Sequence, residues 1–186
     1  SMLTGLYPHQ NGQIGLAHLG YSMQPDVPTL PTLLKQAGYR TGIIGKLHVQ
    51  PERSFDFDYR QVNTVDTRDI KKVRAKCQAF LGDAGGKPFF LMLNFFDPHD
   101  PHLQDVDGSP KAKVTPEQVK VFPFMGTNSA ALRQRVAEFT TCVNRVDEGV
   151  GVLMEVLRER RLHTNTLIVL LGDNGKLSPI DAATTI

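Results

Sequence analysis

The sequence predicts an α/β fold built on a mainly parallel sheet flanked by helices. Helix-like and strand-like segments alternate along its 186 residues, which is the rhythm of parallel strands joined by crossover helices. The strand-like segments are continuous apolar runs, as expected for strands covered on both faces. Because the length and the 40% hydrophobic composition allow one sizeable core, we expect residues 1–186 to form a single globular unit.

Local signals predict the first elements of this fold. Residues 1–28 are rich in Gly, Pro and polar residues and predict a loop with a short turn of helix near its start. The segment 29–40 predicts a short helix, with Thr29 as its N-cap and Gly38 as its C-cap. The run 40-RTGIIG-45 then predicts a strand.

Apolar spacing predicts the later elements. Residues 68–81 repeat apolar positions with the helical period, and 88-PFFLMLNFF-96 predicts a strand. Residues 130–161 predict the longest helix, and 166-TLIVLLGD-173 predicts a final strand. The long helix should bury one seam, formed by Val136, Phe139, Val143, Val146, Val150, Leu153 and Leu157.

Composition excludes several classes of partner. The net charge of +2 arises from 21 basic and 19 acidic side chains without a long run of one sign, so the sequence predicts no nucleic-acid partner. No apolar run approaches the roughly 20 residues of a membrane helix, so it predicts no membrane segment. Cys77 and Cys142 form no metal, redox or disulfide motif, and we expect buried or free thiols.

The first predicted strand runs into 45-GKLH-48. In an extended segment residues i and i+2 point to the same side, so Lys46 and His48 should face one ligand. A fixed positive charge beside a proton donor suits an oxyanion. The alternative is structural: a lysine stem covering apolar surface beside a hydrogen-bonded histidine. A nucleotide P-loop fits less well, because its spacing of glycines and lysine is not matched.

The second predicted strand leads into 94-NFFDPHDPH-102. Zinc is conceivable here, but Pro98 and Pro101 break the helix that zinc-binding histidine pairs use, and no cysteine joins the cluster. A loop histidine acting as a proton donor, His99 or His102, fits better. A turn rich in Asp and Pro for conformational reasons alone is an equal alternative.

The last predicted strand ends at Asp173 and Asn174. Their oxygen atoms suit calcium or magnesium rather than zinc or copper, although a D-N-G sequence taken singly is usually just a turn. In open α/β sheets ligands collect outside the carboxyl ends of the strands. The prediction of a site therefore depends on all three polar clusters reaching one sheet edge.

Five stretches carry a resemblance to a known family. They are 3-LTGLYPHQNG-12, 38-GYRTGIIGKLHV-49, 88-PFFLMLNFFDPH-99, 145-RVDEGVGVLMEVLRERRL-162 and 165-NTLIVLLGDNG-175. In this order they resemble the sulfatases of the alkaline-phosphatase superfamily, whose fold is the one predicted above. The resemblance implies a hydrolase of sulfate esters or sulfamates that acts on a sulfated carbohydrate or another sulfate ester.

The resemblance also implies roles for the residues singled out above. Lys46 and His48 would contact the sulfate and the aldehyde hydrate of the nucleophile, and His99 would serve the leaving group or the sulfate. We also expect His102 to contribute to substrate binding. Asp173 and Asn174 would ligate the metal, which is Ca²⁺ in most sulfatases.

The family nucleophile is a cysteine converted to formylglycine within C-x-P-S-R-x-x-x-L-T-G. Only the tail of this motif occurs here, as 1-SMLTG-5, so the cysteine would stand six positions before Ser1. The stretch 176-KLSPIDAATTI-186 also departs from the family pattern. We therefore expect a fragment that is inactive by itself and has an incomplete calcium site.

The same residues are compatible with two other functions. A phosphatase or phosphodiesterase of the same superfamily would use metal, lysine and histidine in the same way. A non-catalytic remnant would bind a partner, or self-associate, through an exposed sheet edge or the predicted seam of the long helix.

Overall fold

The computed structural model describes residues 1–62, 65–83 and 85–172, which fall into two compact units. The first unit comprises Ser1–Thr67 and Ala75–Phe96, and the second comprises Arg68–Arg74 and Asp97–Ile186. Helix α3 (Ile70–Gly82) contributes residues to both. Short 3₁₀ helices occupy Ala17–Leu19, Glu52–Ser54, Val65–Arg68, Pro123–Met125 and His163–Asn165.

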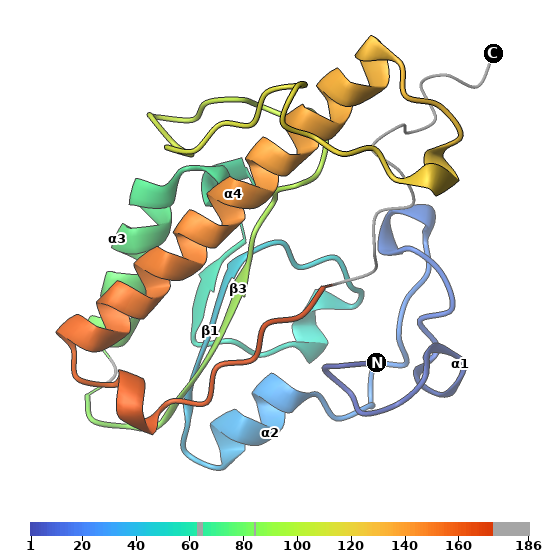
Figure 1. Ribbon diagram of the computed structural model, residues 1–186. Helices are drawn as coiled ribbons and strands as arrows, with labels where there is room; N and C mark the ends of the chain where they lie inside the picture. Colours follow the sequence, from blue (N-terminus) through green and yellow to red (C-terminus); the bar gives the residue numbers. More distant parts are fainter. Residues whose placement is uncertain (63–64, 84, 173–186) are drawn as a thin grey trace. The chain divides into compact units, whose positions relative to one another are not determined.

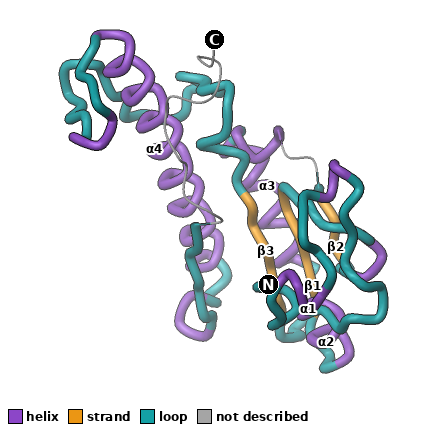
Figure 2. The backbone as a smooth tube through the Cα atoms, turned by 90° about the vertical axis from the view of Figure 1, so that its right-hand side faces the viewer, coloured by secondary structure: helices purple, strands orange, loops and turns teal. Residues whose placement is uncertain are grey.

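The first unit is built on a parallel sheet. Its strands are β1 (Arg40–Gly45), β2 (Tyr59–Gln61) and β3 (Phe89–Asn94), in the order β2-β1-β3 (Figure 2). The predicted parallel sheet and the strands at 40–45 and 88–96 are thereby confirmed. The sequence did not predict β2, because three residues with a central Arg60 give no hydrophobic period.

One face of the sheet packs against Phe80 of α3, which confirms the helix predicted at 68–81. The Phe80 ring lies 5.6 Å from the ring of Tyr59 on β2 and 6.1 Å from that of Phe89 on β3. Between them lies Gly42 of β1, where an added Cβ would stand 2.5 Å from the Phe80 ring. Glycine at this position thus lets one aromatic side chain reach across all three strands.

The opposite face covers the core of the first unit. Ile43, fully buried at the middle of β1, packs with Met23, Phe55 and Phe57. Half-buried residues extend this cluster: Leu3, Val27, Leu47, Val49, Phe90 and Met92. The central strand β1 is therefore covered on both faces, as its continuous apolar run predicted, whereas the residues of β3 are only half-buried.

Two helices precede β1 in the chain. The short helix α1 (Pro8–Asn11) is the turn predicted near the start, and α2 (Leu30–Gln36) is the helix predicted at 29–40 (Figure 1). Thr29 is the N-cap of α2, but its hydroxyl donates to the carbonyl of Ser54 at 2.6 Å instead of capping the helix. This bond ties the start of α2 to the loop that follows β1.

The second unit contains the long helix α4 (Ala130–Glu159), as predicted (Figure 1). The Ser129 side chain caps it by accepting from the Leu132 amide at 3.2 Å. The predicted seam is partly wrong, because Val143 is 40% exposed while Thr141 and Arg145 are buried. Those two polar side chains can be buried because the Val114 amide and the Asp97 carboxylate bond to them.

The strand predicted at 166–173 is not formed by its described residues. Residues 167–172 have no regular secondary structure, and Leu167 and Leu170 are 89% and 76% exposed. A strand exists only through hydrogen bonds to a neighbour, and the described sheet is limited to β1, β2 and β3. Among the described residues no helix is both long and apolar enough to cross a membrane.

Candidate functional site

The segment after β1 alternates between exposed and half-buried side chains. Leu47 and Val49 pack against the core of the first unit, whereas Lys46 and His48 are exposed. The two apolar anchors therefore turn the lysine and the histidine outward to the same side, as the spacing predicted. This arrangement presents a cation and an imidazole together at the carboxyl end of the central strand.

Gly45 and Asn94 hold the start of this segment. Gly45, paired with Asn94 of β3, has φ +95°, and an added Cβ would lie 1.9 Å from the Asn94 carbonyl oxygen. The Asn94 side chain donates to the carbonyl of Lys46 at 2.7 Å. The carboxyl ends of β1 and β3 thus meet at one sheet edge, and the position of the Lys46 backbone is fixed from β3.

His18 joins this group, and sequence reasoning did not find it. Its Nδ1 lies 3.0 Å from Nε2 of His48, and the two rings stack with centroids 5.1 Å apart. The preceding Gly-rich loop gave no periodic signal that could place His18 near residue 48. Because one ring nitrogen must donate and the other accept, the tautomers of the two histidines depend on each other.

The second unit holds His99 on the irregular stretch that follows Asp97. The His99 side chain is exposed, and its Nδ1 lies 2.8 Å from the carbonyl oxygen of Asp100. A carbonyl oxygen can only accept, so Nδ1 carries the proton of this bond. In neutral His99 the Nε2 atom is then the nitrogen able to take up a proton.

His102 has a different environment. Its side chain is only 4% exposed, its Nε2 lies 3.2 Å from a carboxylate oxygen of Asp100, and its ring meets the Phe139 ring edge-on. These contacts are typical of a histidine that supports the loop. His99 is therefore the better placed of the two to meet a substrate, and substrate binding by His102 stays a prediction.

Asp97 is buried between two arginines that sequence reasoning did not single out. Its carboxylate accepts from Nε of Arg68 at 2.9 Å and from Nε of Arg145 at 2.6 Å. Both guanidinium groups are almost fully buried. One feature of the sequence could have indicated the burial of Arg145: it stands three residues after Cys142, on the same buried face of α4.

The predicted site residues are only partly brought together by the described structure. Lys46 and His48 share one side of the first unit, while His99 and His102 share one loop of the second. Asp173 and Asn174 lie outside the described residues. Within residues 1–62, 65–83 and 85–172, no group of three or more His, Cys, Asp or Glu side chains could hold a metal ion.

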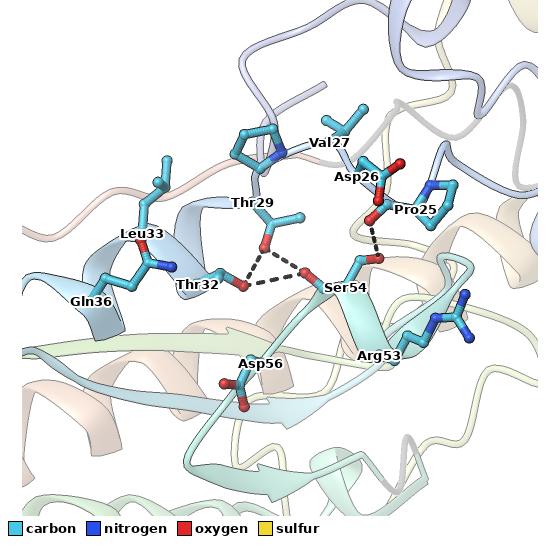
Figure 3. Close-up of a pocket in the computed structure, with 11 residues that line it drawn as sticks. Pro25, Asp26, Val27, Thr29, Thr32, Leu33, Gln36, Arg53, Ser54 and Asp56 are labelled. Carbon is cyan, nitrogen blue, oxygen red and sulfur yellow. Dashed lines mark hydrogen bonds between the residues drawn. The ribbon is translucent and has the colours of Figure 1, made fainter.

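The first unit also has a surface pocket of about 490 Å³ between the start of α2 and the 53–56 loop (Figure 3). Its hydroxyl groups are hydrogen-bonded: those of Thr29 and Thr32 lie 2.9 Å apart, and that of Ser54 donates to the carbonyl of Pro25 at 3.2 Å. None of the predicted site residues lines it. The pocket is therefore separate from the predicted site.

Comparison with known proteins matches most of the chain. A family model described as Sulfatase matches residues 1–180. Human N-sulphoglucosamine sulphohydrolase is 35% identical over 201 residues, covering 94% of this chain and 40% of the relative. The five stretches singled out in the sequence resemble this relative, which is also called heparan N-sulfatase. An ulvan-active sulfatase of Formosa agariphila is 28% identical, covering 94% of this chain and 34% of the relative.

Solved structures share the fold at low sequence identity. A suggested sulfatase of Bacteroides fragilis has a TM-score of 0.64 and 18% identity, covering 88% of this chain and 48% of that one. A protein solved with its substrate D-glucosamine-2-N,6-O-disulfate has a TM-score of 0.58 and 19% identity, covering 87% of this chain and 52% of that one. The chain thus spans about half the length of these structures and less than half that of the two relatives.

Proposed function

Because the chain belongs to the sulfatase family, we propose that it is part of an enzyme that hydrolyses a sulfate ester or sulfamate. One observation carries this proposal: the segment after β1 exposes Lys46 and His48 on one side while Leu47 and Val49 anchor it in the core. A cation beside an imidazole, on a segment whose backbone is anchored in the core, suits a tetrahedral oxyanion such as sulfate.

Lys46 and His48 bind the sulfate oxygens in this proposal. The Lys46 ammonium group is a compact point charge, and its attraction for the sulfate oxygens grows as negative charge develops on them in the transition state. His48 donates a hydrogen bond from a ring nitrogen. His18, 3.0 Å from His48, sets which ring nitrogen of His48 carries the proton.

His99 serves the leaving group. As the bond from sulfur to oxygen or nitrogen breaks, protonated His99 gives a proton to the departing atom. The carbonyl of Asp100 occupies Nδ1, so Nε2 is the atom that transfers the proton. The nucleophile that attacks sulfur is supplied by the family's formylglycine, which the motif places before Ser1.

Calcium is the metal that the family resemblance implies. The described residues form no cluster able to hold it, and Asp173 and Asn174 supply two of the roughly six to eight oxygen ligands that Ca²⁺ takes. The described residues together with Asp173 and Asn174 would therefore make up only part of such an oxygen shell.

The 186-residue chain produced alone should bind calcium weakly or not at all, because it lacks most of the oxygen shell. Isothermal titration calorimetry measures this directly. A tight site of one calcium ion per chain that persists in Asp173→Ala would contradict the assignment.

The substrate that we propose is a sulfated carbohydrate. Two proteins similar to this chain support this proposal. One is named N-sulphoglucosamine sulphohydrolase, and the other was solved in complex with its substrate D-glucosamine-2-N,6-O-disulfate.

The test uses a full-length protein that carries these 186 residues, matured by a formylglycine-generating enzyme. It should hydrolyse N-sulfated or O-sulfated sugars, and His99→Ala should slow substrates with poor leaving groups most. The 186-residue chain alone should show no turnover, since loss of a nucleophile costs on the order of a millionfold. Hydrolysis of phosphate esters without any hydrolysis of sulfates would favour the phosphatase alternative.

A further inference from the structure

The stretch from Asp97 to Pro110 carries His99 but has little regular secondary structure. Its only ladder contact among the described residues is the bridge between Val106 and Ser109. Its carbonyl groups therefore need other partners. Two buried arginines of the same unit supply them.

Arg68 and Arg145 each bind both the Asp97 carboxylate and the loop backbone. Arg68 Nη2 donates to the carbonyls of His99 at 2.6 Å and Pro101 at 2.8 Å. Arg145 donates to the carbonyls of Leu103 at 2.8 Å and Ser109 at 3.1 Å. Because a guanidinium is a rigid planar fork of five N–H donors, one side chain can hold several acceptors in a fixed geometry, whereas the three donors of a lysine sit on a single atom at the end of a flexible stem.

The carbonyl of Asp100 lies between the two that Arg68 holds. This is the carbonyl that binds Nδ1 of His99. Arg68 thus fixes the peptide units on both sides of the acceptor that orients the imidazole. Asp97 in turn fixes Arg68, and Arg145 fixes Asp97.

We propose that Arg68 and Arg145, joined through Asp97, are positioning residues that hold His99 in the tautomer with Nδ1 protonated, and so assign proton transfer to Nε2. Only the role of Nε2 in proton transfer rests on the proposed function. In that reaction the imidazolium gives its Nε2 proton to the departing oxygen or nitrogen, and the electron pair of the N–H bond stays on Nε2.

The direct test is ¹⁵N nuclear magnetic resonance of the histidines in the 186-residue chain, with His99→Gln used to identify the His99 signals. In its neutral form, wild-type His99 should show a protonated Nδ1 and an unprotonated Nε2. Arg68→Lys should shift the population towards the Nε2-protonated tautomer, and Arg145→Lys should do so to a smaller extent. Arg158→Lys, an exposed arginine in the last turn of α4, should leave the populations unchanged.

An Nε2-protonated His99 in the wild type would overturn the proposal, as would wild-type populations in folded Arg68→Lys. If Arg68→Lys fails to fold, the wild-type and Arg145→Lys spectra still decide. The readout needs no activity, so a failure of the proposed function is seen separately.

The full-length enzyme provides a second readout. Arg68→Lys should lower kcat for a sugar sulfate about tenfold or more and leave an activated aryl sulfate, which needs no proton, within about threefold. In a His99→Ala background it should have no further effect on the sugar sulfate. An equal loss on both substrates would indicate a merely structural role.

Discussion

At the scale of single residues, the end of β1 depends on a contact that only glycine permits. Gly45 has φ +95° and lies against the backbone of Asn94, whose side chain in turn holds the Lys46 carbonyl. Any side chain at position 45 would move β3 away or twist the segment that follows. The position of Lys46 is therefore set by packing between two strands.

Gly45→Ala should destabilise the chain more than Gly38→Ala does. Both glycines have positive φ, but an added Cβ at Gly38 meets no atom within 4 Å, whereas at Gly45 it meets the Asn94 carbonyl at 1.9 Å. Gly38→Ala should cost about 1–2 kcal/mol from backbone strain, and Gly45→Ala about 1–3 kcal/mol more from overpacking. Urea denaturation of both variants measures this. Equal midpoints would contradict it.

Because Cys77 is buried, we expect the stability of the folded chain to depend on pH. Burial raises the pKa of its thiol to about 12, above the ordinary value of 9.0. The folded state thus holds this proton more tightly than the unfolded state, so its stabilising contribution is complete below pH 9 and is lost as the pH rises from 9 towards 12.

The thiol should accordingly resist iodoacetamide at pH 8 in the folded chain and react after unfolding. Mass spectrometry of the labelled peptides checks this, and Cys77→Ser should remove part of the loss of stability in alkali. Rapid labelling of native Cys77 would show that the site is open.

Sequence reasoning found the residues whose environment is set by their neighbours in the chain. It missed those whose environment is set by residues far away in the sequence. Lys46 and His48 were predicted to share a side because i, i+2 spacing in an extended chain decides it. Arg145 was missed because its burial depends on Asp97, which lies 48 positions earlier in the chain. The roles of Lys46, His48, His99, His102, Asp173 and Asn174 stay predictions.

At the scale of elements, hydrophobic periodicity predicted those whose signal is local. The long helix, the two apolar strands and α2 all formed where the pattern placed them. The exception is 166–172, whose apolar run indicates a strand but whose described residues find no partner strand. Strand formation requires a neighbour, and a local pattern does not contain that information.

This exposed run should drive self-association of the isolated chain. Residues 166–171 combine high β-propensity with no charge and no proline, which is the signature of an aggregation-prone strand. Leu170→Lys should therefore reduce the concentration dependence of the molecular mass measured by light scattering. Val143→Lys on α4, at another exposed apolar residue, should reduce it less. A wild-type chain that stays monomeric at high concentration would contradict the expectation.

At the scale of the whole molecule, the chain is a sulfatase-family segment whose described residues fall into two compact units. The sequence predicted one partial domain, and we still propose that both units belong to one catalytic domain. The α/β class and the parallel order of the sheet could be predicted because alternating helices and apolar strands favour one architecture. The completeness of the candidate site could not be predicted in the same way, because its residues come from separate parts of the chain.

If the segment after β1 holds a sulfate, the loss of the Lys46 charge should slow sulfate hydrolysis. In the matured full-length protein, Lys46→Ala should lower kcat/KM for a sulfated sugar by roughly a hundredfold or more, as expected when a charge facing a developing oxyanion is lost. Lys87→Ala, an exposed lysine before the amino end of β3, should leave the rate unchanged. Undiminished sulfatase activity in folded Lys46→Ala would contradict the account.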